Sequence, residues 1–110
     1  MALFDFEPIA GSGVSNVLSC NGIEKFDRST GTHTYSVVVT GEPTAVSITI
    51  QGSLDLIHWA DVSSQSFDVD DLSAGFKMFH IANTPVISVR ALIETTGGTD
   101  PLTSIKGLIL

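Results

Sequence analysis

The stretch Val46-Ser47-Ile48-Thr49-Ile50-Gln51 alternates strictly between an aliphatic side chain and a hydroxyl or amide side chain. Successive side chains of a β-strand point to opposite faces, so this period of two produces one apolar face and one polar face. The stretch is therefore predicted to be a strand that lies on a core, with its three aliphatic residues facing inward.

Further strand signals occur at residues 35–40, 76–81, 87–94 and 104–110. In the stretch 87–94, the apolar residues Ile87, Val89 and Ile93 are expected to face the same core. Clusters rich in Gly, Pro, Asp and Asn separate the strands at intervals of about eight to twelve residues. Helix signals are poor, and only a short helical turn near Ser53 to Ile57 is expected.

Together these signals predict one all-β domain, either an antiparallel β-sandwich or a jelly-roll-like small barrel. A chain of 110 residues supports a single hydrophobic core. Residues 31–110 are expected to form the sandwich, and residues 1–30 an N-terminal arm and edge segment. In that segment Phe4, Phe6 and Ile9 precede a Gly/Ser-rich stretch, and they either cover the core of their own domain or reach a neighbouring subunit.

The charge balance excludes several kinds of partner. Five basic and twelve acidic residues give a net charge of -7, and the cations are scattered, so neither nucleic acid nor an anionic membrane surface is expected to bind. No apolar run approaches the roughly 18 residues that a membrane helix needs. Cys20 is the only cysteine, and the N-terminus lacks a basic segment, so the chain is expected to fold in a reducing cytoplasm.

No motif predicts catalysis, a metal or a cofactor. The acidic run around Asp68, Asp70 and Asp71 does not fit a calcium-binding loop and is interpreted as a hairpin loop. Ser12 and Cys20 lack the local signatures of catalytic nucleophiles. The histidines are far apart and are interpreted as surface or packed residues, namely His33, His58 and His80.

Aromatic residues are too few for an obvious sugar-binding platform. Trp59 is the only tryptophan and Tyr35 the only tyrosine. Trp59 is therefore expected to be largely buried, where it would support the turn after Gly52. Exposure of Trp59, Tyr35 or His58 on one surface would instead favour a glycan-binding module.

Residues 44–59 resemble a strand–turn–strand signature of the form "ITIQGSLDG…W", and residues 86–91 and 95–99 resemble a last hairpin of the form "VRA…TGGT". These signatures occur in small β-sandwich virion structural proteins of tailed phages, which include capsid decoration (cement) proteins and tail or fibre components. The resemblance covers roughly the last two-thirds of the chain. It departs at Leu56, where the usual glycine is missing, and this departure predicts a reshaped turn.

The resemblance implies a non-enzymatic decoration protein that binds the major capsid protein of a phage head and resides in the virion after assembly in the host cytoplasm. It also implies a homotrimer, since decoration proteins commonly sit at threefold positions of the shell. Leftover apolar residues, such as Val38 and Leu92, independently predict a homo-oligomer. Attachment is assigned to the arm, which is expected to be dispensable for folding, through Phe4, Asp5, Phe6, Glu7 and Ile9.

Two other functions remain open at this point. One is a glycan- or receptor-binding module of a phage tail or fibre. The other is an enzyme or accessory domain, which the missing catalytic motifs disfavour. The fold alone does not choose among the three functions, because β-sandwiches carry many activities.

Overall fold

The computed structural model describes residues 2–19, 31–84, 86 and 88–109, and it confirms the expected all-β sandwich. The strands within these residues, in chain order with the single helix, are β1 (Ala2–Asp5), β2 (Ile9–Ala10), β3 (Gly13–Val14), β4 (Leu18–Ser19), β5 (His33–Thr40), β6 (Ala45–Ser53), β7 (Ala60–Ser66), α1 (Val69–Ala74), β8 (Phe76–Ile81), β9 (Ser88–Thr96) and β10 (Leu102–Ile109).

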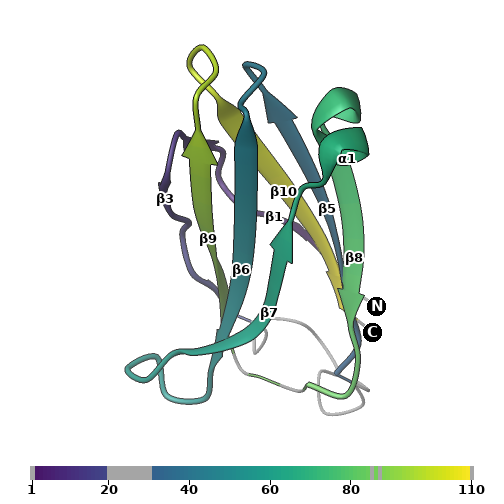
Figure 1. Ribbon diagram of the computed structural model, residues 1–110. Coiled ribbons are helices and arrows are strands. Elements are labelled where there is room, and N and C mark those ends of the chain that lie inside the picture. The colour runs from purple at the N-terminus through teal and green to yellow at the C-terminus, as the bar shows by residue number, and fades with distance from the viewer. Residues whose placement is uncertain (1, 20–30, 85, 87, 110) are drawn as a thin grey trace.

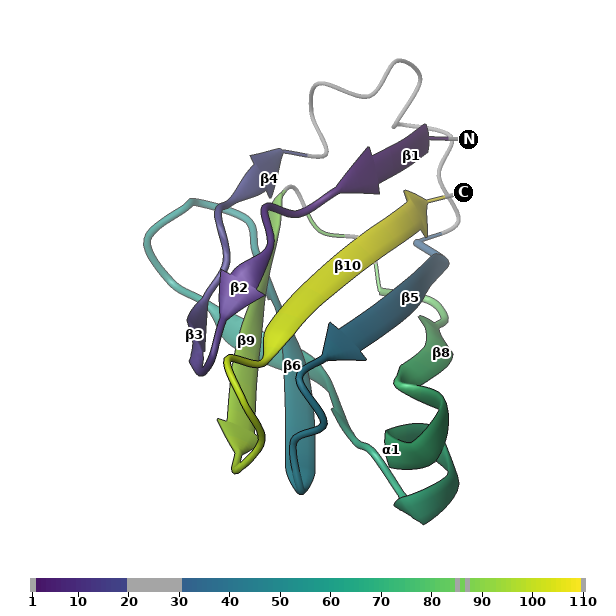
Figure 2. The ribbon, with the colours of Figure 1, turned by 90° about the horizontal axis from the view of Figure 1, so that it is seen from above.

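The strands form two sheets with a jelly-roll topology. The first sheet has the order β1-β10-β5-β8 with β2 also on β10, and the second has the order β3-β9-β6-β7 with β4 also on β9 (Figures 1 and 2). β10 pairs with β1 and β2, β9 with β3 and β4, β5 with β8, and β6 with β7, all antiparallel. These nested pairs resemble one long hairpin wrapped around a core, which is the jelly-roll arrangement.

The core lies between the two sheets and follows the alternation expected from the sequence. The inward-facing residues of β6 and β9 are at most 3% exposed, namely Val46, Ile48, Ile50, Val89 and Ile93. Ile48 lies directly opposite Ile93 in the β6–β9 pair. From the first sheet, Tyr35, Val37 and Ile105 complete the centre. The remaining expected inward residue, Ile87, lies outside the described residues.

The described part of the N-terminal segment takes one of the two roles that the sequence left open, because it covers the core of its own domain. Residues 2–19 contribute edge strands to both sheets, and the backbone N–H of Phe6 donates to the carbonyl of Ile105 over 3.0 Å. Phe6 and Ile9 are 4% and 8% exposed and belong to the core. Burial of this apolar surface offsets the entropy of ordering the segment. The segment thus covers the core of its own domain.

Two elements were not expected from the sequence. The helix α1 occupies the acidic run interpreted as a hairpin loop, and no helix forms at Ser53 to Ile57. Asp68 caps α1 by accepting from the N–H of Asp71, while the Asp71 carboxylate accepts from the N–H of Asp68. This reciprocal capping box, followed by Gly75 in the left-handed region at φ 69°, is a recognisable helix signal. The strand β7 was missed because its serine-rich sequence lacks apolar alternation.

The burial of Phe6 leads to a stability prediction. Phe6→Ala should lower the free energy of unfolding by about 3 kcal/mol, because it removes a core side chain and leaves a cavity. Val14→Ala is the matched control, since Val14 is 56% exposed on the neighbouring β3. Urea unfolding followed by circular dichroism measures both. Equal stability of the two variants would contradict the placement of Phe6 in the core.

Candidate functional site

The connection between β6 and β7, residues 54–59, projects from one end of the sandwich, the end opposite α1 (Figure 1). Three of its side chains are aliphatic and well exposed: Leu54 is 68%, Leu56 59% and Ile57 76% exposed. Single exposed aliphatic residues are common on protein surfaces, but three within four positions form an apolar tip. We refer to residues 54–58 as the tip loop.

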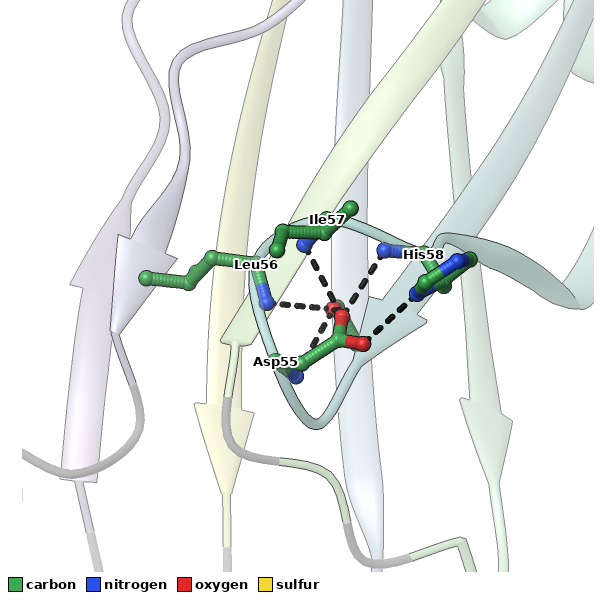
Figure 3. A network of polar contacts seen from close by, with 5 residues as sticks. Asp55, Leu56, Ile57 and His58 are labelled. Carbon is green, nitrogen blue, oxygen red and sulfur yellow. Dashed lines mark hydrogen bonds and ion pairs between the residues drawn. The ribbon is translucent and has the colours of Figure 1, made fainter.

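One carboxylate fixes the backbone of the tip loop (Figure 3). Asp55 Oδ1 accepts from the N–H of Ile57 over 2.9 Å, from the N–H of His58 over 2.8 Å and from the Ser53 hydroxyl over 3.2 Å. Asp55 Oδ2 accepts from His58 Nδ1 over 2.7 Å, so the proton of a neutral His58 lies on Nδ1. The Ser53 hydroxyl oxygen in turn accepts from the N–H groups of Asp55 and Leu56.

These donors hold the pKa of the Asp55 carboxyl well below its usual range. The backbone N–H of His58 contributes most, followed by the His58 side chain and the backbone N–H of Ile57. Asp55 is therefore ionised at physiological pH and can accept all of these hydrogen bonds. Asp and Ser side chains commonly order turns in this way by bonding to the backbone two or three residues further on.

Leu56 lies in the left-handed region of backbone space, with φ 65°. A residue with a Cβ atom pays about 1–2 kcal/mol for this conformation. The resembled phage signature has glycine at this position, and the structure gives the reason, because glycine adopts positive φ freely. The Leu56 side chain points away from the carboxylate that orders the loop (Figure 3), and the reshaping of the turn relative to the glycine-containing signature stays a prediction.

A shallow hollow of about 470 Å³ adjoins the tip loop. Leu54 and His58 line its loop side, and Ala60, Val62 and Val86 line the rest with Gly52, Ser53 and Asp55. The lining is mainly aliphatic, and the His58 side chain is 85% exposed at its border. The tip loop and the hollow thus form one apolar surface with a few polar groups.

Trp59 is not in the core, which corrects the expectation from the sequence. It is only partly buried, and the guanidinium carbon of Arg90 lies 4.3 Å from its ring centroid. Arg90 Nε donates to Gln51 Oε1, and Gln51 Nε2 donates to Asp61 Oδ1, each over 2.8 Å. These four residues form a connected polar cluster on the outer face of the second sheet.

Of the three histidines, which were interpreted as surface or packed residues, one is buried and two are exposed. His33 is fully buried, and its Nε2 donates to the carbonyl of Thr84 over 2.8 Å, while Nδ1 lies 2.9 Å from the Tyr35 hydroxyl. Burial lowers the pKa of His33, so the ring is neutral and Nδ1 accepts from Tyr35. His80 is exposed on β8. Tyr35 is fully buried, so it cannot contribute to a sugar-binding surface.

The described residues show no cluster of side chains that could hold a metal ion, and the one Ser, His and Asp group is not arranged for nucleophilic activation. No group of three or more His, Cys, Asp or Glu side chains lies close enough to hold a metal ion. Although Asp55 and His58 pair, the Ser53 hydroxyl donates to Asp55 and not to His58, so the imidazole does not activate it. Cys20 lies outside the described residues.

The acidic run of α1 is engaged in capping and in an ion pair. Lys77 Nζ lies 3.0 Å from Asp71 Oδ2. The backbone N–H of Asp68 and then the Lys77 side chain lower the pKa of Asp71.

No described helix is long and apolar enough to cross a membrane.

The attachment residues expected in the N-terminal arm are not brought together as one exposed surface. Phe4 pairs with Gly107 in the β1–β10 ladder, and the burial of Phe6 and Ile9 keeps them from filling pockets of a partner. Asp5 and Glu7 are exposed, and the Asp5 carboxylate lies 3.8 Å from Lys106 Nζ.

No protein family model matches the chain, and no curated protein is similar to it in sequence. Several solved structures share its fold. The SPBc2 prophage-derived protein YomS is 11% identical, with a TM-score of 0.59 over 98% of this chain and 90% of YomS. PirA is 10% identical, with a TM-score of 0.53 over 98% and 93% of the two chains. The Yersinia pseudotuberculosis-derived mitogen is 15% identical, with a TM-score of 0.52 over 99% and 85%. At these identities the similarity concerns the fold, a small jelly roll of comparable length.

The positive φ of Leu56 leads to a prediction about loop strain. Leu56→Gly relieves the left-handed strain, whereas Leu54→Gly has no such strain to relieve, since φ of Leu54 is not positive. Both variants gain the same flexibility in the unfolded state, so Leu56→Gly should be more stable than Leu54→Gly by about 1 kcal/mol. Thermal and urea unfolding of the pair measures the difference. A Leu56→Gly variant no more stable than Leu54→Gly would show that the loop stores no strain.

Proposed function

We propose that this chain is a non-enzymatic structural protein of a phage particle, which decorates the head shell by binding its major capsid protein through the tip loop. The observation that carries the proposal is the apolar tip formed by Leu54, Leu56 and Ile57. These side chains stand on a backbone that the Asp55 carboxylate holds in one conformation. Exposed aliphatic residues on an ordered, locally strained loop are a common feature of binding sites.

The energetics of such a loop favour a protein partner. Burying one aliphatic side chain of this size contributes about 1.5–3 kcal/mol. Because the loop is already ordered, little conformational entropy is lost when it binds. Hydrophobic anchors in pockets of a partner, surrounded by polar contacts, are the usual centre of a protein interface. The tip loop therefore takes the anchoring role that the sequence suggested for Phe6 and Ile9.

The fold and the charge agree with a role in a particle. Jelly rolls are frequent in viral shells, although they also occur in lectins and other proteins. YomS, which shares this fold over nearly the whole of both chains, is described as prophage-derived. The net charge of -7 favours a basic protein surface and opposes packaged nucleic acid. Exposed Asp5 and Glu7 can add contacts to basic residues of the shell.

The proposal also places this chain in the virion and includes its assembly as a homo-oligomer. The phage resemblance implies three copies, and this number stays a prediction. Sedimentation of the purified chain measures it independently of shell binding.

Shell binding is tested with empty heads assembled without this chain from the same particle. The wild-type chain should co-sediment with the heads. Ile57→Glu should weaken binding at least about tenfold, because a charge replaces an aliphatic anchor. Val69→Glu is the matched control, since Val69 is 81% exposed on α1 at the other end of the sandwich and should bind like the wild type.

Circular dichroism establishes that both variants are folded. Two results would reject the proposal: a wild-type chain that stays in the supernatant, or folded Ile57→Glu that binds the heads as tightly as Val69→Glu. Binding that instead depends on Asp5 and Glu7 alone would move the attachment site to the N-terminal segment.

A second candidate function is glycan recognition by a tail or fibre module, and the cluster of Trp59, Arg90, Gln51 and Asp61 favours it. A partly exposed tryptophan beside planar polar side chains is a surface suited to sugar rings and their hydroxyl groups. The outward-facing residues of β6 and β7 around it are also hydroxyl-rich, and Thr49 Oγ1 lies 3.3 Å from Ser64 Oγ.

The second candidate is tested with an immobilised panel of bacterial surface oligosaccharides. If the cluster binds a glycan, Trp59→Ala should abolish retention of the chain, and Trp59→Phe should keep part of it because a ring remains. Urea unfolding of Trp59→Ala shows whether the domain stays folded. Failure of the wild-type chain to bind any oligosaccharide of the panel would argue against this function.

A further inference from the structure

The strand β8 is a free edge of the first sheet. It pairs with β5 along one side, and no described strand pairs with its other side (Figure 1). A free edge offers backbone N–H and C=O groups that can pair with another chain, and most proteins protect such edges with charges, prolines or bulges.

The register identifies the residues whose backbone groups face the free side. The N–H of Val39 donates to the carbonyl of Gly75 over 2.9 Å, so this pair occupies a hydrogen-bonded position of the β5–β8 ladder, although the N–H of Gly75 itself donates to Asp71 at the end of α1. Hydrogen-bonded and non-hydrogen-bonded pairs alternate in an antiparallel ladder. Consequently Phe76, Met78 and His80, which lie opposite Val38, Ser36 and Thr34, direct their N–H and C=O groups away from β5.

The side chains of the same residues lie on the outer face of the sheet, over which no described element packs. Phe76 is 41% exposed and Met78 58%, and Val38, directly opposite Phe76, is 44% exposed. The free edge and this apolar patch are therefore continuous. No Asp or Glu occurs among the outward-facing residues of β5 and β8, although the chain as a whole is strongly acidic.

The corresponding edge of the second sheet is protected. Ile50 pairs with Ser63 and the next residue, Gln51, with Asp61, so Val62 is an extra residue that forms a bulge in β7. Bulges and polar side chains discourage pairing at an edge. By contrast, β8 has neither a proline nor a register shift. Its one lysine, Lys77, is held by Asp71 over 3.0 Å.

We propose that a second copy of this chain docks on β8, so that the two β8 strands pair antiparallel about a two-fold axis near Met78. In this register Phe76 of each copy lies opposite His80 of the other, and each such pair exchanges two hydrogen bonds. The patches around Val38 and Phe76 then form one apolar surface across the dimer. A closed two-fold pair buries the same patch on each copy and leaves no free β8 edge.

This inference deepens the homo-oligomer part of the proposed function and assigns it a two-fold pair in place of the threefold arrangement that the resemblance implies. Long-range repulsion between the two acidic copies is screened beyond about 10 Å at 0.1 M ionic strength. At the contact itself the outward-facing residues of β8 carry no carboxylate. The tip loop is not part of β8, so shell binding and pairing can be measured separately.

The mass in solution gives the first test. Sedimentation at micromolar concentration should give twice the monomer mass of 11.6 kDa. Met78→Lys should raise the dissociation constant of the dimer at least about tenfold, because it places two like charges at the axis. Val69→Lys, which changes an exposed valine of α1, should leave the dissociation constant unchanged.

Two further readouts separate strand pairing from contact between the outer faces. Met78→Pro removes only an N–H that points away from β5, so it should abolish the dimer while the monomer stays folded. Amide hydrogen exchange at Phe76, Met78 and His80 should slow with rising protein concentration, whereas the amides of Lys77 and Phe79 should be protected at all concentrations.

The inference is overturned by a monomer or a trimer at all concentrations, or by a dimer that persists in folded Met78→Pro. Loss of pairing in Met78→Lys with unchanged binding to empty heads would leave the proposed function standing. Conversely, a dimer of the wild type that does not bind heads would retain the interface and reject the shell-binding role.

Discussion

The pairing of β6 with β9 is the constraint on which the rest of the structure depends. Ile48 and Ile93 lie opposite each other at the centre, at most 1% exposed, and the whole ladder runs from Ala45 to Ser53. Because the side-chain period is two, a slip of one residue would expose every inward-facing aliphatic side chain of the strand. The buried residues therefore determine which side chains reach the outer face and where the ladder ends.

Both candidate surfaces of the second sheet follow from that register. Gln51 lies opposite Arg90 in the ladder, and this places the two side chains on the outer face, where Arg90 reaches the ring of Trp59. The ladder ends at Ser53, and the tip loop begins there without any core of its own. Its shape comes from hydrogen bonds to Asp55 and Ser53, so its aliphatic residues remain available to a partner.

The edge strands β7 and β8 differ in how readily another strand could pair with them. In the second sheet, the bulge at Val62 and the hydroxyl side chains of β7 discourage further pairing. In the first sheet, β8 remains regular and apolar on its outer face. Such an edge would favour aggregation if it were left open, which is the physical reason to expect a defined partner there.

The sequence by itself determined the fold class and the inward-facing residues, because period-two alternation and turn residues are local properties. The departure at Leu56, a leucine where the resembled signature has glycine, drew attention to this turn, but only the structure shows its positive φ. The capping box of α1 was equally local and could have been recognised from Asp68, Asp71 and Gly75.

Only the tertiary structure decided the roles of the N-terminal segment, of Trp59 and of the exposed aliphatic residues. Phe6 is buried because the chain between β1 and β2 meets residues near Ile105, about a hundred positions away, and no local pattern contains that contact. Trp59 could have packed in the core, but the register of β9 placed Arg90 beneath its ring on the outer face. Likewise, the apolar residues of the tip loop and of β8 became surface because no described element packs over them, and this depends on how all strands are arranged in space.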